Sequence, residues 1–187
     1  MSEFRRYFVP GGTYFFTLVT AGRAPLFESA AARALLGKSM RETCDEHRFT
    51  TVAIVLLPEH LHAIWMLPLG DQEYPARWKA IKARFTSEWL RAGGCEGPLT
   101  DGYRRQRRRG VWQPRYMEHT IRDEGDLEAH LHYLHYNPVK HGYTRRPRDW
   151  AWSSFARYVA SGDYPEDWGA DERRPPDFGD VDADLLE

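Results

Sequence analysis

The feature that most constrains the fold is the stretch of residues 52–68, where Pro58 and Glu59 separate two apolar runs. The β-branched residues of these runs predict two strands, and the short connection predicts that they pair antiparallel. In the second run, His60 and His62 alternate with apolar residues. Alternate side chains along a strand share a face, so we expect the two imidazoles to lie side by side on a sheet.

This histidine pair has two interpretations. Two adjacent imidazoles can form half of a metal site, because imidazole nitrogen is a common ligand of divalent metals. They can equally be two hydrogen-bonded histidines at the start of a strand. The pair alone does not decide between these readings, so other residues must complete the argument.

The pattern along the chain predicts an α+β protein. Strands are predicted over residues 13–20, 49–57, 61–67 and 111–121, and helices over residues 27–47, 76–92, 123–137 and about 153–160. We expect Ser29 to cap the first helix, Pro114 to place a bulge or an edge in the fourth strand, and Pro138 to end the third helix. The order matches the ferredoxin-like (split βαβ) fold, an antiparallel sheet with helices on one face. The third helix would lie beside that sheet, followed by a C-terminal extension.

The net charge of −1 conceals an asymmetry along the chain. Nine acidic residues and two arginines fall within residues 165–187, which leaves about +6 on residues 1–164. We therefore divide the chain into one domain, residues 1–164, and an acidic tail, residues 165–187. A basic domain suits a polyanionic partner such as nucleic acid, although a mildly basic domain with a solubilising tail would have the same composition.

Several classes of protein are disfavoured. Cys44 and Cys95 lie far apart without Cys-x-x-Cys spacing, which argues against a disulfide framework and a zinc ribbon. We find neither an apolar run of membrane-spanning length nor a signal-peptide pattern at the N-terminus, so we expect a cytoplasmic protein with no membrane partner.

Two arginine groups are candidates for phosphate contacts. The first is a pair before the first strand, Arg5 and Arg6. The alternative is that these two arginines belong to a solvated N-terminal arm. The second lies in a predicted loop, residues 93–110, and consists of Arg104, Arg105, Arg107, Arg108 and Arg109. Such a run repels itself and should be disordered until it meets an anion, which suits a nucleic-acid backbone; the alternative is a solvated loop.

The third predicted helix carries Tyr133 and Asn137, which share a face because they are four residues apart. Core packing would explain a lone tyrosine, but the Asn137 amide oxygen could also complete a metal site with the two histidines. A tyrosine hydroxyl, with a pKa of about 10, can attack a phosphodiester when a metal polarises the phosphoryl oxygen. The product, a phosphotyrosine, preserves the bond energy for rejoining, so the arrangement favours strand transfer over hydrolysis.

The sequence resembles a known family. His60-Leu61-His62 resembles the His-hydrophobe-His motif of the HUH single-strand endonucleases, and Tyr133 with Asn137 resembles their single-tyrosine transposase branch. More specifically, the chain resembles the REP-associated tyrosine transposases over residues 3 to about 169. The stretches that carry this resemblance are FRRYFVPGGTYFFT, LLPEHLHAIWMLP, RWKAIKARFT, VWQPRYMEHTIRDE, YLHYNPVKHG and DWAWSSFARYVASGDYPEDW.

The resemblance implies a function. Family members cut and rejoin single-stranded DNA at REP hairpins, use Mg²⁺ or Mn²⁺, and form a 5′-phosphotyrosine with a free 3′-hydroxyl. Carried over to this chain, Tyr133 is the nucleophile, and His60, His62 and Asn137 hold the metal; imidazole ligands suit Mn²⁺ better than Mg²⁺. The same resemblance favours a monomer.

The family's DNA contacts carry over less completely. Arg5 and Arg6 are candidates for reading a short unpaired motif beside the hairpin, and Arg115 for a phosphate contact. The chain departs from the family pattern at Met117, where an aromatic residue is usual, and in the longer loop of residues 93–110. The first departure puts base stacking at that position in doubt, and the second suggests that the arginine run adds affinity for the DNA backbone.

Two other functions compete with strand transfer. One is a domesticated protein that holds a nucleic-acid hairpin without cutting it, and the other is a metal phosphodiesterase that hydrolyses its substrate without the tyrosine. A further hypothesis concerns the tail, which could fold back on the basic cleft and compete with DNA, so that truncation after Pro165 would raise cleavage. The alternative is a tail that only solubilises the protein.

Overall fold

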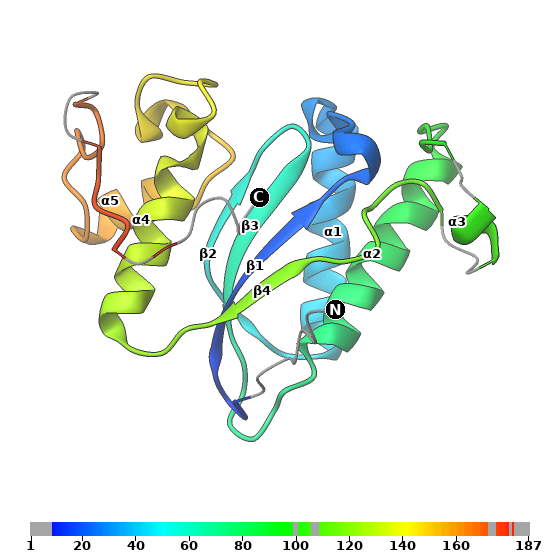
Figure 1. Cartoon of the computed structure of the whole chain (residues 1–187), viewed down its shortest axis with the longest axis horizontal. Coiled ribbons are helices and arrows are strands. Elements are labelled where there is room, and N and C mark those ends of the chain that lie inside the picture. The colour runs from blue at the N-terminus through cyan, green and yellow to red at the C-terminus, as the bar shows by residue number, and fades with distance from the viewer. Residues whose placement is uncertain (1–8, 99–100, 106–108, 172–174, 180, 182–187) are drawn as a thin grey trace.

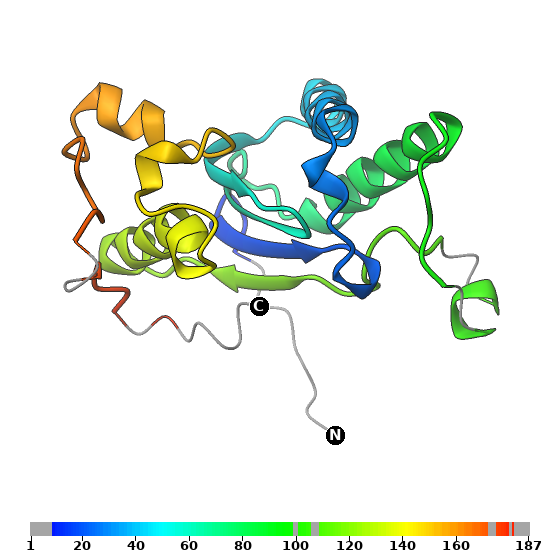
Figure 2. The same cartoon turned by 90° about the horizontal axis from the view of Figure 1, so that it is seen from above.

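The computed structural model describes residues 9–98, 101–105, 109–171, 175–179 and 181. Four strands form an antiparallel sheet in the order β2-β3-β1-β4, namely β1 (Thr13–Val19), β2 (Thr50–Leu56), β3 (His60–Met66) and β4 (Met117–Thr120). Helices α1 (Ala30–Glu46) and α2 (Tyr74–Arg91) cover one face, and α4 (Glu124–Lys140) covers the other (Figure 1, Figure 2). This is the predicted ferredoxin-like arrangement, with the tyrosine-bearing helix opposite the two packing helices.

The central strand β1 is buried on both faces, because helices lie above and below it. Tyr14, Phe16 and Leu18 point toward α1 and α2, whereas Phe15 belongs to the cluster beneath α4. The alternation of strand side chains therefore divides the interior into two cores that share one sheet.

The core beneath α1 and α2 is built from aromatic rings. Trp65 of β3 stacks on Trp78 of α2, with ring centroids 3.9 Å apart and an interplanar angle of 16°. Phe16 meets both rings edge-on. Large aromatic side chains bury much apolar surface, so this contact fixes α2 against the centre of the sheet.

A buried arginine anchors the start of α2. Arg77 is 3% exposed and forms a bidentate ion pair with Asp71, at 2.9 and 2.6 Å. The same guanidinium donates hydrogen bonds to the backbone oxygens of His47 and Arg48, beyond the end of α1. The pair therefore ties the α2 N-terminus to the connection between α1 and β2.

The structure corrects the prediction that Pro138 ends the third helix. α4 continues to Lys140 with Pro138 inside its last turn. A proline removes one backbone donor, but its carbonyl still accepts, here from the amide of Tyr143 at 2.9 Å. Asn137 thus lies inside the helix, which fixes the direction of its side chain. At the other end Asp123 caps α4, and Ser29 caps α1 as predicted.

Other boundaries differ from the sequence prediction. β4 is shorter than residues 111–121, because Pro114 interrupts the pairing and leaves an isolated bridge between Thr20 and Trp112. The predicted loop contains a short helix, α3 (Asp101–Arg105), so Arg104 and Arg105 are helical in this structure. After α4 the chain forms α5 (Phe155–Ser161). Within the described ranges, no helix combines the length and apolarity needed to cross a membrane.

The ion pair of Asp71 with Arg77 generates a prediction for stability. Asp71→Asn should lower the free energy of unfolding by about 2 kcal/mol near neutral pH, because a buried guanidinium loses its charged partner. The hydrogen bond from Arg77 holds the pKa of the Asp71 carboxyl below its usual value. The unfolded chain therefore takes up the proton first as the pH falls, and the wild type loses this stabilisation below about pH 4.

Urea denaturation of both proteins at about pH 7 and about pH 3 measures the effect. The difference between them should shrink at the lower pH. Asp101→Asn, at a side chain that is 88% exposed, is the matched control and should change little. A difference that is the same at both pH values would contradict this account.

Candidate functional site

The two histidines of β3 lie on the face that α4 covers. His60 and His62 are 1% and 0% exposed, and their ring centroids are 4.9 Å apart. The Nε2 atom of His60 lies 3.3 Å from Oδ1 of Asn137, which α4 presents from above. Packing of α4 on the sheet therefore brings Asn137 to the two histidines, although it is 77 positions from His60 in the sequence.

The Nδ1 atom of each imidazole is hydrogen-bonded to a neighbouring side chain. The Nδ1 atom of His60 lies 3.0 Å from a carboxylate oxygen of Glu59, and Nδ1 of His62 lies 2.8 Å from the hydroxyl of Thr17. The hydrogen bond from His60 lowers the pKa of Glu59 to about 2. Thr17 is directly opposite His62 in the register of β1 and β3. Contacts of this kind orient imidazole ligands, and here they leave both Nε2 atoms for the site.

The polar atoms of this site fit a divalent cation. Among the described residues, Nε2 of His62 is a buried imidazole nitrogen without a hydrogen-bond partner. Burial, with nearby positive groups, lowers the pKa of His62 well below its usual value, so the imidazole is in the neutral form that binds metal. Two imidazole nitrogens and one amide oxygen form a donor set for a first-row divalent metal.

Tyr133 lies one helical turn before Asn137 and faces the same site. Its ring centroid is 5.4 Å from that of His62. The ammonium group of Lys140 lies 3.5 Å from the Tyr133 hydroxyl oxygen and 5.0 Å from the ring centroid. The structure therefore brings together all four residues that the sequence suggested, His60, His62, Tyr133 and Asn137.

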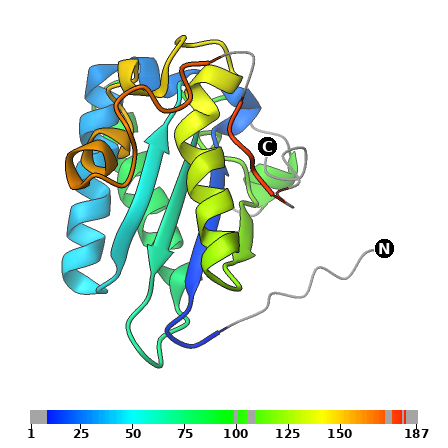
Figure 3. The same cartoon turned by 90° about the vertical axis from the view of Figure 1, so that its left-hand side faces the viewer.

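A segment of the acidic tail covers this tyrosine. Phe178 meets the Tyr133 ring edge-on, with centroids 5.9 Å apart, and also contacts Tyr136. The carbonyl of Asp177 is hydrogen-bonded to Nδ1 of His132 at 3.2 Å. Tyr133 is 1% exposed. Figure 3 shows this segment, coloured red, running alongside α4.

A second group of possible metal ligands lies at the beginning of α4. His119 of β4 and His130 stack on each other with ring centroids 4.4 Å apart, and each contacts one oxygen of the Asp126 carboxylate, at 2.9 and 3.1 Å. Arg122 also donates its backbone amide and its guanidinium to this carboxylate. Burial raises the pKa of Asp126, but the hydrogen bonds from Arg122 and His119 outweigh it and hold the pKa below its usual value. These partners already satisfy the carboxylate, so the group also serves as a link between β4 and α4.

The arginine candidates are not gathered at the histidines. Arg104 and Arg105 lie on α3, on the opposite side of the molecule from α4 (Figure 1). Arg109 pairs with Glu96 at 2.6 Å, and Arg115 is exposed before β4. The other four predicted contacts lie outside the described residues; they are Arg5, Arg6, Arg107 and Arg108.

The sequence analysis missed three residues of the site. Glu59 directly precedes His60, so its proximity was visible in the sequence but its contact with Nδ1 was not. Thr17 is identified only by the strand register. Lys140 is seven residues, or two helical turns, after Tyr133. That spacing could not place the two side chains on one face, because Pro138 was expected to end the helix before Lys140.

The chain is similar to known proteins over most of its length. Two curated relatives named for the REP-associated tyrosine transposases match the chain. The Haemophilus influenzae relative is 41% identical and the Escherichia coli relative 39% identical, over 90% and 91% of this chain and 94% and 93% of theirs. A REP-associated tyrosine transposase solved with a bound REP hairpin superposes with a TM-score of 0.78 at 38% identity, covering 98% of this chain and 96% of that one.

No family model matches the chain. The full-length similarity to both curated relatives and the shared fold are nevertheless sufficient to assign the family, as the sequence resemblance predicted. We conclude that the chain belongs to the REP-associated tyrosine transposases.

Proposed function

We propose that this protein cleaves and rejoins single-stranded DNA at REP-type hairpins through a 5′-phosphotyrosine on Tyr133. His60, His62 and Asn137 would hold Mg²⁺ or Mn²⁺, with Mn²⁺ favoured by the imidazole ligands. The observation that carries the proposal is the convergence of these three side chains with Tyr133, including the buried Nε2 of His62 that has no partner among the described residues. A protein that only bound DNA would not need two imidazoles, an amide oxygen and a tyrosine to converge on one point.

The metal would polarise the phosphoryl oxygen and align the scissile phosphate. The Tyr133 oxygen attacks phosphorus, the bond from phosphorus to the 3′ oxygen breaks, and a free 3′-hydroxyl leaves. Lys140 donates to the Tyr133 oxygen and stabilises the negative charge that develops there when the hydroxyl loses its proton. Attack of a 3′-hydroxyl on the phosphotyrosine reverses these steps and restores the DNA strand.

The proposed DNA partner agrees with the relative that was solved with a REP hairpin. Arg5, Arg6 and Arg115 are our candidates for contacts to the DNA beside the hairpin. The loop arginines are candidates for additional backbone contacts, and these are Arg104, Arg105, Arg107, Arg108 and Arg109. We propose that one chain suffices for cleavage, and that it acts in the cytoplasm because its substrate is DNA.

We also propose that a short part of the tail, residues 175–179, gates the site. Phe178 packs on Tyr133, so a DNA strand must displace it to reach the hydroxyl. The first part of the tail has a different role, because Trp168 stacks on Tyr164 with centroids 4.6 Å apart and belongs to the packing around α5. A truncation after Asp171 therefore removes Phe178 and keeps the Trp168 packing, which the cut after Pro165 that the sequence suggested would lose.

Tyr133→Phe should abolish a covalent protein–DNA adduct while leaving hairpin binding unchanged. The variant removes only the attacking oxygen from a ring that keeps its packing. A REP-type hairpin labelled at its 3′ end, incubated with Mn²⁺ and resolved on a denaturing protein gel, shows the adduct as a labelled band at protein mass. Cleaved DNA that persists in this variant would indicate hydrolysis, and a gel shift without cleavage in the wild type would favour a hairpin-binding protein.

Metal titration by calorimetry distinguishes the two histidine clusters. His62→Ala should remove the Mn²⁺ binding that supports cleavage, and Thr17→Val should weaken it by about 10- to 100-fold through loss of ring orientation. His119→Ala, in the second cluster, is the matched control and should leave this binding unchanged. If His119→Ala removes the binding and His62→Ala does not, the metal assignment is wrong.

Removal of the tail after Asp171 should raise the rate of adduct formation severalfold, because Tyr133 is then uncovered. Phe178→Ala in the full chain should raise the rate in the same way, because the packing of this ring covers Tyr133. If the charge of the tail were responsible instead, removing an acidic side chain alone would raise the rate. Comparing Phe178→Ala with Asp177→Asn in a single-turnover assay separates these causes. A rate that neither Phe178→Ala nor the truncation raises would contradict the gate.

A further inference from the structure

Polar side chains recur every four residues along the end of α4. They are Tyr133, Asn137 and the residue that caps the helix, His141. Residues four apart share a helix face. The helix continues through Pro138, and the backbone of His141 stays in the right-handed helical region. The stripe that carries Tyr133 and Asn137 to the histidines of β3 therefore carries His141 to the same place.

The imidazole of His141 lies against that of His60. Their ring centroids are 5.1 Å apart with an interplanar angle of 66°, close to the 4.9 Å and 77° between His60 and His62. Two imidazoles on one ion have centroids roughly 4.5–5.5 Å apart, because each metal–nitrogen bond is about 2.1 Å long and the bonds meet at about 90° to 110°. Both neighbours of His60 therefore stand at the separation that a common ion requires.

A network of contacts fixes His60 and His141 relative to each other. The Nε2 atom of His141 is buried, and its ring stacks on Tyr143 with centroids 6.0 Å apart. The Tyr143 hydroxyl donates to one carboxylate oxygen of Glu59 at 3.0 Å, and the other oxygen lies 3.0 Å from Nδ1 of His60. Tyr143 thus couples the positions of the two imidazoles, as residues that orient metal ligands do.

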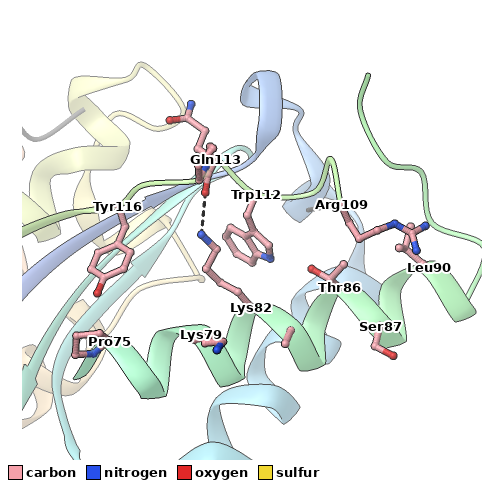
Figure 4. Close-up of a pocket in the computed structure, with 12 residues that line it drawn as sticks. Pro75, Lys79, Lys82, Thr86, Ser87, Leu90, Arg109, Trp112, Gln113 and Tyr116 are labelled. Carbon is pink, nitrogen blue, oxygen red and sulfur yellow. Dashed lines mark hydrogen bonds between the residues drawn. The ribbon is translucent and has the colours of Figure 1, made fainter. Parts of the chain in front are cut away.

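The charges around these imidazoles are compatible with a cation. Glu59 places a carboxylate beside His60, and its pKa of about 2 keeps it ionised. Of the neighbouring cations, Arg23 is paired with that carboxylate at 3.7 Å, and Lys140 is directed to the tyrosine hydroxyl at 3.5 Å. Lys79 and Lys82 line a cleft of about 710 Å³ beside α2, on the other face of the sheet (Figure 4).

We propose that His141 is a further protein ligand of the metal, a proposal that rests on the metal site proposed above. The donor set then becomes three imidazole nitrogens and one amide oxygen. Imidazole is a softer ligand than the oxygens that Mg²⁺ prefers, so a third ring makes the site discriminate more strongly against Mg²⁺. The competing role for His141 is a spacer between the rings of Tyr143 and His60, which requires its stacking but not its nitrogen.

Electron paramagnetic resonance counts the nitrogen ligands of Mn²⁺ added to the full chain at less than one ion per chain. The wild type should show three imidazole couplings and His141→Phe should show two, because phenylalanine keeps the stacking on Tyr143 but has no donor nitrogen. Calorimetry should show an Mn²⁺ affinity lower by about 100-fold in this variant, since losing a ligand costs at least as much as losing the residue that orients one. His47→Ala, at an exposed histidine after α1, is the matched control and should change neither result.

His141→Asp tests the same assignment through metal selectivity. A carboxylate is a ligand that suits Mg²⁺, so the Mg²⁺ affinity should rise relative to the Mn²⁺ affinity by about tenfold. A spacer between two rings would not produce this change. Unchanged nitrogen couplings in His141→Phe, or an unchanged affinity ratio in His141→Asp, would overturn the proposal.

The Tyr133 adduct is scored with the same preparations, which separates the two proposals. An adduct in the wild type, with couplings that His141→Phe does not alter, overturns only the role of His141. Three couplings that fall to two, without any adduct in the wild type, overturn only the cleavage. Bound Mn²⁺ without imidazole couplings would overturn both.

Discussion

The site depends on the packing of α4 across β3. The 3.3 Å contact between Nε2 of His60 and Oδ1 of Asn137 exists only because the helix crosses the sheet above the histidines. Phe15, Ile64 and Leu134 form the apolar cluster that holds the two elements together. The polar residues lie at the edge of that cluster, so their low exposure follows from the same packing. An unpaired polar atom is tolerated there because the surrounding core determines its position.

The second constraint is the antiparallel register of β1 and β3. It places Thr17 opposite His62 and Val19 opposite His60. The first pair orients an imidazole ring on the α4 face. The second pair is extended by the hydrogen bond that the amide of Gln113 donates to the carbonyl of Val19, which links the segment before β4 to the histidine end of the sheet. A shift of one residue would turn both histidines to the opposite face, where α1 and α2 pack.

Local periodicity explains what the sequence could predict. The alternation of His60 with His62 requires only a strand, and the spacing of Tyr133 and Asn137 requires only a helix. The sheet order followed from the order of the elements. Contacts between elements were not predictable in this way, because the Thr17 hydroxyl and the Phe178 ring reach the site through tertiary packing. The prediction that Pro138 ends α4 was wrong, because a proline near the last turn removes only one hydrogen bond and the helix can continue through it.

The central claim is that His60, His62 and Asn137 hold the metal that Tyr133 uses. Anomalous diffraction from Mn²⁺-soaked crystals of the protein lacking residues 172–187 tests it most directly. Our account predicts a manganese peak between Nε2 of His60, Nε2 of His62 and Oδ1 of Asn137, next to the Tyr133 hydroxyl. A peak only at the cluster of His119, Asp126 and His130, or none at either place, would contradict it.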